Sequence, residues 1–138
     1  QQAHKAAQLG EVPVGAVIVS ADGEVIASAH NLVESQCDAT AHAERLVLRE
    51  AMRLLNQKFL VGCDLWVTLE PCAMCAGAIS NARIRRLYYG AEDKKGGAVE
   101  HGSHVFSHAT CHHKPEIYGG VKASKASKLL EEFFAERR

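Results

Sequence analysis

Three residues near the middle of the 138-residue chain have the types and spacing of a zinc-binding set. One is His42, and the other two are Cys72 and Cys75, which form a C-x-x-C pair. One imidazole and two thiolates are a common ligand set for Zn²⁺, and three protein ligands leave the fourth tetrahedral position for water. We therefore expect one zinc ion per chain, at a site with an open side.

A carboxyl group lies close to this set, because Glu44 follows His42 by two residues. A carboxylate beside an activated water can take up the proton of the water and deliver it to a ring nitrogen and then to a leaving amine. General acid–base transfer of this kind contributes about 10²–10⁴-fold in rate. The spacing therefore predicts that Glu44 is a catalytic residue.

Each of these residues also has a structural interpretation. His42 could be a hydrogen-bonded histidine at a helix end, and Glu44 could be a favourable charge in a first helical turn. The C-x-x-C pair could be a redox pair or half of a structural zinc site. A four-ligand structural site would need another donor, which Cys111 or His112 could supply. The order of the motifs, each after an expected strand, favours the catalytic interpretation.

Strands and helices alternate along the chain. Apolar, β-branched runs predict strands at residues 14–19, 24–27, 64–69, 86–90 and 116–118, and Asp22-Gly23 between the first two predicts a hairpin. Periodicity and end signals predict helices at residues 1–9, 41–56, 72–82 and 122–138, with Thr40 as an N-cap and Pro71 at a first helical position. Residues 91–113 are predicted to be a loop with a short helix. The pattern indicates an α/β domain.

This arrangement would bring the chemistry-bearing residues together. Right-handed crossovers make the strands on either side of a helix parallel, so both central helices begin at the same edge of the sheet. His42 and Cys72 each fall in the first turn of one of these helices, and they become neighbours although they are far apart in sequence. Free N–H groups and the helix dipole favour the thiolate form there.

Length and composition limit the class of protein. The chain is 47% hydrophobic and 23% charged, which is typical of one ordinary globular domain over residues 1–138. No apolar run approaches the ~18 residues of a membrane span, the first residues are not a signal peptide, and an odd number of cysteines argues against a disulfide framework. We expect a cytoplasmic protein without a membrane partner, whose natural N-terminus lies upstream of Gln1.

Charge excludes one further class. The formal net charge is zero, so the whole chain is not a non-specific polyanion binder. Basic side chains outnumber acidic ones in residues 83–138, however, and this half could present a local anion-facing surface.

Longer segments carry a resemblance to a known family. The segments 41–44 (AHAE) and 67–79 (VTLEPCAMCAGAI) resemble the motifs of bacterial tRNA-specific adenosine deaminases, within the cytidine deaminase superfamily. The likeness extends to residues 11–17 and 89–98 and to Phe133-Phe134 with Arg137-Arg138, and so covers nearly the whole chain. The zinc motifs specify only the superfamily, whereas the flanking segments indicate the tRNA enzymes.

The resemblance implies a fold and an activity. It implies a three-layer α/β/α sandwich with a five-stranded mixed sheet in the order 2-1-3-4-5, and a homodimer. The implied reaction is zinc-dependent hydrolytic conversion of adenosine to inosine at the wobble position of a tRNA anticodon. Two other interpretations stay open: a deaminase of a free nucleobase or nucleotide of the guanine or cytosine type, and a non-catalytic zinc module that binds nucleic acid.

The resemblance also implies roles for single residues. Matching positions assign zinc binding to His42, Cys72 and Cys75 and proton transfer to Glu44. Substrate-binding residues carried over in the same way are Asn31 and the Ala43 backbone for the purine, Asp93 and Lys95 for the anticodon backbone, and Phe134 and Arg137 for further RNA contacts. Arg45 departs from the family pattern, which usually has an apolar residue after H-x-E.

Three further features have more than one interpretation. Glu70 either belongs to the functional motif or is a carboxylate at a helix start. Of Phe133 and Phe134, we expect one to point inward and one to be exposed. The histidines of residues 101–113 could form a second metal site, although a loop with polar packing is favoured.

Overall fold

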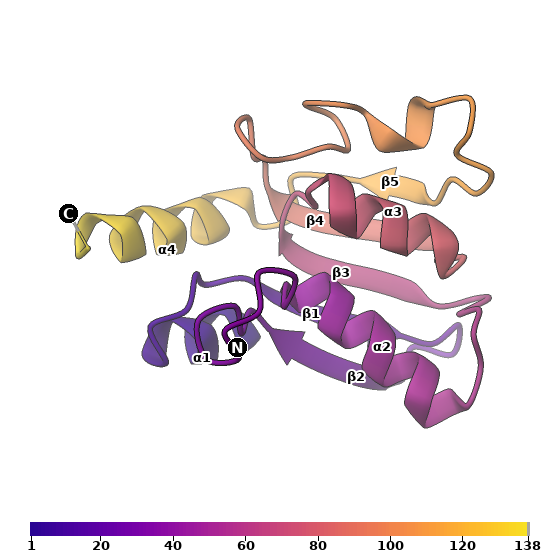
Figure 1. Ribbon diagram of the computed structural model, residues 1–138, viewed down its shortest axis with the longest axis horizontal. Coiled ribbons are helices and arrows are strands. Elements are labelled where there is room, and N and C mark those ends of the chain that lie inside the picture. Colours follow the sequence, from indigo (N-terminus) through magenta and orange to yellow (C-terminus); the bar gives the residue numbers. More distant parts are fainter. Residues whose placement is uncertain (138) are drawn as a thin grey trace.

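A single five-stranded sheet forms the centre of the computed structural model, which describes residues 1–137 (Figure 1). The strand order is β2-β1-β3-β4-β5, as expected. β1 pairs antiparallel with both β2 and β3, whereas β3, β4 and β5 are parallel. The strands are β1 (Gly15–Val19), β2 (Val25–His30), β3 (Asp64–Leu69), β4 (Arg86–Ala91) and β5 (Glu116–Tyr118).

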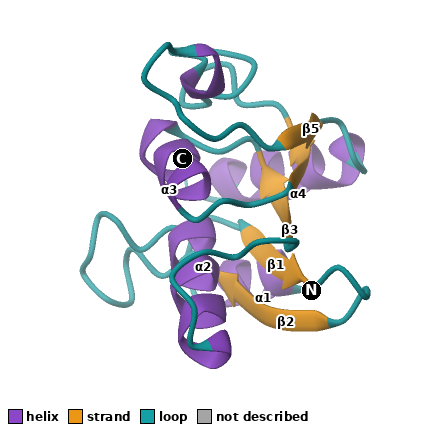
Figure 2. Ribbon diagram, turned by 90° about the vertical axis from the view of Figure 1, so that its right-hand side faces the viewer, coloured by secondary structure: helices purple, strands orange, loops and turns teal. Residues whose placement is uncertain are grey.

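Helices cover both faces of the sheet and give the expected three layers (Figure 2). On one face lie α2 (Ala43–Leu55) and α3 (Ala73–Asn81), and on the other lie α1 (Gln2–Gln8) and α4 (Ala123–Ala135). Glycines in the strands let α1 and α4 approach the sheet closely. A Cβ at Gly15 would lie 2.6 Å from the backbone of α1, and one at Gly90 would lie 3.2 Å from Ala126 of α4. A short 3-10 helix, η1 (Val105–Ser107), lies between β4 and β5.

The main core lies between the sheet and the pair α2 and α3. Side chains alternate along a strand, so Leu65 and Val67 of β3 point into this core, where they meet Val47 of α2 and Ile79 of α3. Trp66 points to the opposite face and stacks on Tyr88 with ring centroids 3.9 Å apart. No helix among residues 1–137 is long and apolar enough to cross a bilayer.

The two central helices begin later than expected: α2 begins two residues after the predicted start at residue 41, and α3 one residue after the predicted start at residue 72. His42 and Cys72 are the N-cap residues of α2 and α3, and both have extended backbones, with ψ of 149° and 176°. Thr40 is therefore not the N-cap, and its hydroxyl instead donates to Asp38. Pro71 precedes the N-cap and is not the first helical residue. Neither side chain makes a capping hydrogen bond to its own helix, which leaves both available as ligands.

The last helix differs from the expectation along its length. α4 ends at Ala135, and Arg138 lies outside the described residues. Its large apolar side chains differ in burial: Phe133 is buried, Leu129 and Leu130 are half-buried, and Phe134 is 48% exposed. The reason is that α4 packs on β3 and β4 and then extends past the edge of the sheet (Figure 1).

Core packing makes a direct prediction for stability. Leu65 is fully buried between the sheet and the helices. Replacing Leu65 with alanine removes packed atoms and leaves a cavity, which should lower the free energy of unfolding by about 2–5 kcal/mol in urea denaturation. Val61→Ala is the control, because Val61 is 77% exposed and should change stability by at most about 0.5 kcal/mol. Equal losses in the two variants would contradict this placement of the core.

Candidate functional site

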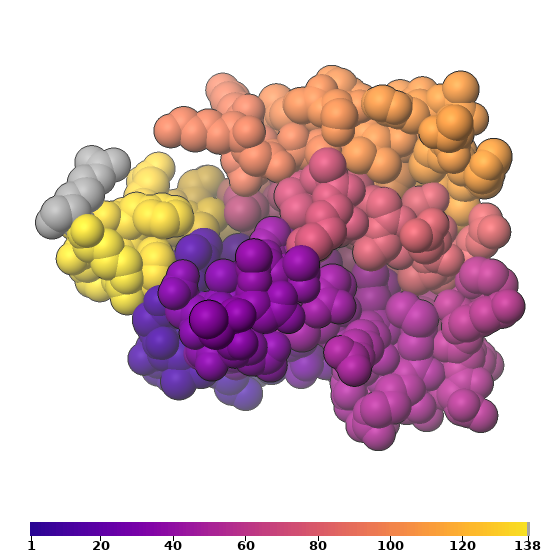
Figure 3. Space-filling model, viewed as in Figure 1, coloured from indigo at the N-terminus to yellow at the C-terminus, as the bar shows by residue number. Residues whose placement is uncertain are grey.

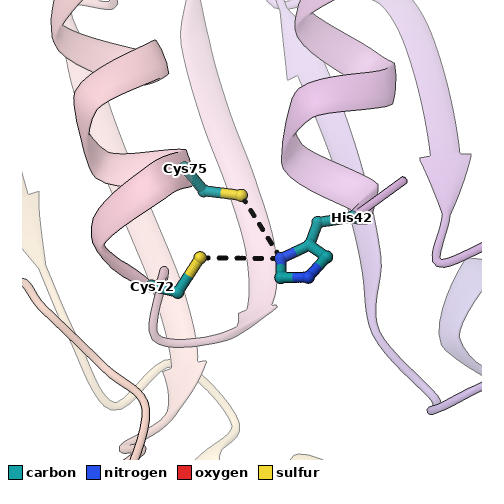
Figure 4. A group of neighbouring side chains, drawn as sticks. All are labelled: His42, Cys72 and Cys75. Atoms are coloured by element: carbon teal, nitrogen blue, oxygen red, sulfur yellow. Dashed lines mark hydrogen bonds between the residues drawn. The ribbon is translucent and has the colours of Figure 1, made fainter. Parts of the chain in front are cut away.

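Three ligand atoms converge where α2 and α3 begin (Figure 4). The Nδ1 atom of His42 lies 3.5 Å from the Sγ atom of Cys72 and 3.6 Å from that of Cys75. Metal–sulfur and metal–nitrogen bonds typical of zinc, at a tetrahedral angle, would place such donors about 3.6 Å apart. The donor types and their spacing therefore fit a four-coordinate metal ion.

The fold explains why these atoms meet. Each of the two N-cap positions carries one donor, and Cys75 lies three residues after Cys72, so both sulfurs face the same side of α3. In residues 1–137 this is the one group of three or more His, Cys, Asp or Glu side chains with ligand atoms close enough to hold a metal ion. The described residues thus supply three donors and leave one side open.

Neither proposed fourth donor from the sequence belongs to this group. The Sγ atom of Cys111 donates to the carbonyl of His113, 3.2 Å away, and lies beside Ser80 at the far end of α3. His112 is not part of the group either. The histidine-rich loop is held by polar packing: His113 contacts the carbonyl oxygen of Ile84 and His108 that of Ser103.

The two thiols have opposite acidities. The hydrogen bond from Cys75, together with that from the His42 ring, lowers the pKa of Cys72 to about 4. The same contact raises the pKa of Cys75, because its proton is shared with the Cys72 sulfur. The Cys72 contact also raises the pKa of His42. One thiolate is therefore in place to receive a cation.

Glu44 lies beside the ligand group in a nearly closed environment. Only 5% of the residue is exposed. Burial raises the pKa of its carboxyl to about 7, while a hydrogen bond from Cys75 acts in the opposite direction. A carboxyl group in this position can hold or release a proton next to the open side of the ligand group.

Two members of the ligand group, His42 and Cys72, line a pocket of about 690 Å³. In Figure 3 the segments after β2 and after β4 and the end of α4 border the same hollow. Residues predicted from the sequence that line the pocket are Asn31, His42, Ala43, Glu44, Cys72, Asp93 and Arg137. Lys95 and Phe134 are exposed and do not line it. Their contacts with RNA stay a prediction.

The end of α4 closes one side of the pocket. The Arg137 guanidinium lies 3.6 Å from the centre of the Phe133 ring, and both side chains line the pocket. Phe133 is buried and Phe134 exposed, as expected for the pair. The family resemblance predicts Phe134 as a substrate contact, whereas Phe133 lines the cavity. A signal was available, because Phe133 and Arg137 are four residues apart and share a helix face.

Two loops complete the walls, and a buried carboxylate contacts each of them. Glu11, which the sequence analysis did not single out, accepts hydrogen bonds from the backbone N–H groups of Glu34 and Ser35. Glu70 is not a carboxylate at a helix start. It is almost completely buried and contacts the loop after β4 instead.

Arg45 has a local structural explanation. Its Nε atom donates to the Thr40 carbonyl at 2.8 Å, and its guanidinium lies 3.5 Å from the Asp38 carboxylate. The loop that precedes α2 therefore uses a charged residue where the family pattern is usually apolar.

Comparison with known proteins gives the family. A family model for MafB19-like deaminases matches residues 1–138. A tRNA-specific adenosine deaminase from Agrobacterium fabrum is 55% identical over 137 residues, which cover 99% of this chain and 90% of that protein. A tRNA-specific adenosine deaminase from Aquifex aeolicus is 47% identical over 140 residues, which cover 100% of this chain and 90% of that protein.

Solved structures agree with this assignment. One from a study of A-to-I editing by tRNA:A34 deaminases at the wobble position of transfer RNA has a TM-score of 0.91 and 55% identity, and covers 94% of this chain and 93% of that one. Guanine deaminase from Bacillus subtilis is more distant, with a TM-score of 0.64 and 33% identity over 99% of this chain and 87% of that one. The chain therefore belongs to the MafB19-like deaminase family, and it is related to tRNA-specific adenosine deaminases.

Proposed function

We propose that this protein is a zinc-dependent hydrolase that deaminates adenosine to inosine at the wobble position of a tRNA anticodon. The observation that carries the proposal is the three-donor group of His42, Cys72 and Cys75, which borders a pocket that His42, Cys72 and Glu44 line. The substrate follows from relatives such as the Agrobacterium fabrum enzyme, which is 55% identical.

The residues of the ligand group divide the chemistry among them. A zinc ion held by His42, Cys72 and Cys75 would lower the pKa of a bound water molecule to about 7. The N-termini of α2 and α3 face the two sulfurs, and their positive dipole ends offset the negative charge of the thiolates. Glu44 would take one proton of the attacking water and give it to a ring nitrogen, where it stays in the product. It would then take the second proton from the hydroxyl added to the ring carbon and give it to the amino group, which leaves as ammonia while the carbonyl forms.

The pocket suits one nucleoside more than a folded RNA. Its volume of about 690 Å³ is within the usual range for small-molecule sites, about 300–1,000 Å³. An enzyme that modifies a base takes that base out of the stack, and the unstacked bases of an anticodon loop allow this. We propose that the buried Asn31 and the Ala43 backbone hold the purine.

Outside the pocket, exposed groups are available for the rest of the RNA. Lys95 and Phe134 lie on the surface outside the pocket. Asp93 and Arg137 line the pocket itself. We propose that these four side chains contact the nucleotides on either side of the target. A tRNA substrate also places the enzyme in the cytoplasm, and the homodimer rests on the family resemblance.

A free guanine is the second candidate substrate. The observation that favours it is the 33% identity with guanine deaminase from Bacillus subtilis, whose fold is similar over most of the chain. The higher identity of 55% with the tRNA-specific relative favours the RNA substrate.

Substrate choice can be tested directly. The purified protein is incubated with an anticodon stem-loop that has adenosine at the wobble position, and separately with free guanine and free cytosine. We expect inosine from the stem-loop and no turnover of the free bases, measured by mass spectrometry of the products. A stem-loop with guanosine at the wobble position is the control. Turnover of a free base alone would reject the RNA substrate.

The role of Glu44 predicts a separation of activity from metal content. Glu44→Ala should retain one zinc per chain and lose at least about 10²–10⁴-fold in kcat, because the proton carrier is gone while the ligands remain. Glu50→Ala is a matched control on the same helix, since Glu50 pairs with Arg53 on the surface. Full activity of Glu44→Ala would show that the mechanism is wrong, and so would a comparable loss in Glu50→Ala.

Metal content tests the number of protein ligands. Cys75→Ala removes one of three donors and should abolish stoichiometric zinc, measured by elemental analysis of the purified protein. Cys111→Ser should retain one zinc per chain, because Cys111 contacts Ser80 and His113 and not the ligand group. Loss of zinc in Cys111→Ser would instead indicate a closed, structural site.

A further inference from the structure

Glu70 makes all its side-chain hydrogen bonds to one short segment, residues 93–101. Its Oε1 atom accepts the backbone N–H of Asp93 at 3.1 Å and contacts the ring Nδ1 of His101 at 2.7 Å. Its Oε2 atom accepts the backbone N–H groups of Val99, Glu100 and His101 at 3.0–3.2 Å. One carboxylate therefore binds the backbone at both ends of the loop that follows β4.

The loop is shaped closely around this carboxylate. A Cβ at Gly97 would lie 2.6 Å from the Glu70 carboxyl carbon and 2.5 Å from the Asp93 carbonyl oxygen, so only glycine fits there. The Glu70 side chain is fully buried. Because an unpaired carboxylate is very costly in such a place, the loop and the carboxylate are stable only in each other's presence.

The same segment forms one wall of the pocket. Asp93 and Gly96 line the cavity, and the Asp93 side chain accepts the backbone N–H groups of Lys95 and Gly96. The backbone of Asp93 is held by Glu70 from the inside. The position of the carboxylate of Glu70 thus determines where the side chain of Asp93 can lie.

A second buried carboxylate contacts the opposite wall in the same way. Glu11 is 0% exposed and accepts the backbone N–H groups of Glu34 and Ser35 at 2.9 and 2.6 Å, together with the Ser35 hydroxyl at 2.5 Å. Val33 and Glu34 line the pocket. Two loops that are distant in sequence are therefore each held by a buried carboxylate, and both glutamates also border the pocket.

We propose that Glu70 and Glu11 are positioning residues, which hold residues 93–101 and 33–35 in the shape that binds the substrate. The inference rests on the proposed function for its substrate. Neither side chain belongs to the ligand group, and Glu44 lies at the start of α2 and not in these loops. Loss of either carboxylate should therefore weaken substrate binding far more than it slows the chemical step.

The test uses Glu70→Gln and Glu11→Gln, in which an amide keeps the size of the side chain and replaces one acceptor oxygen by a donor. The matched control is Asp64→Asn, because Asp64 is a buried carboxylate at the other end of β3 that pairs with Arg85 at 2.9 Å, away from the pocket. For each full-length, zinc-loaded protein we measure KM and kcat on the anticodon stem-loop, zinc content, and amide hydrogen exchange.

We expect KM to rise about tenfold or more in both Gln variants, as for loss of a buried hydrogen bond to a charged group, with kcat within threefold and zinc retained. Hydrogen exchange should become faster at the backbone amides of residues 93 and 99–101 in Glu70→Gln, and at those of residues 34–35 in Glu11→Gln. Asp64→Asn should leave KM and these amides unchanged.

An unchanged KM, a loss confined to kcat, or an equal rise of KM in Asp64→Asn would overturn the proposal. Failure of the proposed function has a different signature, namely that the wild-type protein produces no inosine from the stem-loop. In that case the exchange rates still test whether Glu70 and Glu11 hold these loops. Unchanged exchange at these amides would overturn that role independently of the substrate.

Discussion

Two helices that begin at the same edge of one sheet are the constraint on which the site depends. His42 and Cys72 occupy the N-cap positions of α2 and α3, so the geometry of the ligand group is set by the packing of these helices on the sheet. Both helix N-termini carry free N–H groups and a positive dipole end, which stabilise the sulfur-bound negative charge. A shift of either helix along the sheet would separate the donors, which lie 3.5 and 3.6 Å apart.

Three buried glutamates around the pocket show how environment separates the roles of one residue type. Burial raises the pKa of the Glu44 carboxyl to about 7. Burial also acts to raise the pKa of Glu70 and Glu11, but hydrogen bonds from side chains and from backbone N–H groups outweigh it and hold both values below normal. A carboxyl group that can gain a proton suits proton transfer, and carboxylates that stay charged suit the support of loops.

Much of the fold could be predicted because the local signals agree with one another. The Asp22-Gly23 turn, the β-branched runs and the helical periodicity gave the correct elements, and strand β5 is present although it has only three residues. The starts of α2 and α3 were placed two residues and one residue too early, because an N-cap carrying a metal ligand has none of the usual Ser, Thr or Asp signals. The half-burial of Leu129 and Leu130 in α4 could not be predicted, because periodicity reveals a helix face but not how far the sheet beneath it extends.

By itself the sequence determined the chemistry of this protein. The residue types His42, Glu44, Cys72 and Cys75 and their order along the chain specify the ligand group and its proton carrier, since these properties belong to side chains and short spacings. Only the tertiary structure decided that Cys111 lies at the far end of α3, that Phe133 and not Phe134 lines the pocket, and that Glu70 and Glu11 hold its walls. Those contacts join residues that are 23 or more positions apart, or depend on where one element ends against another, and no local pattern records such distances.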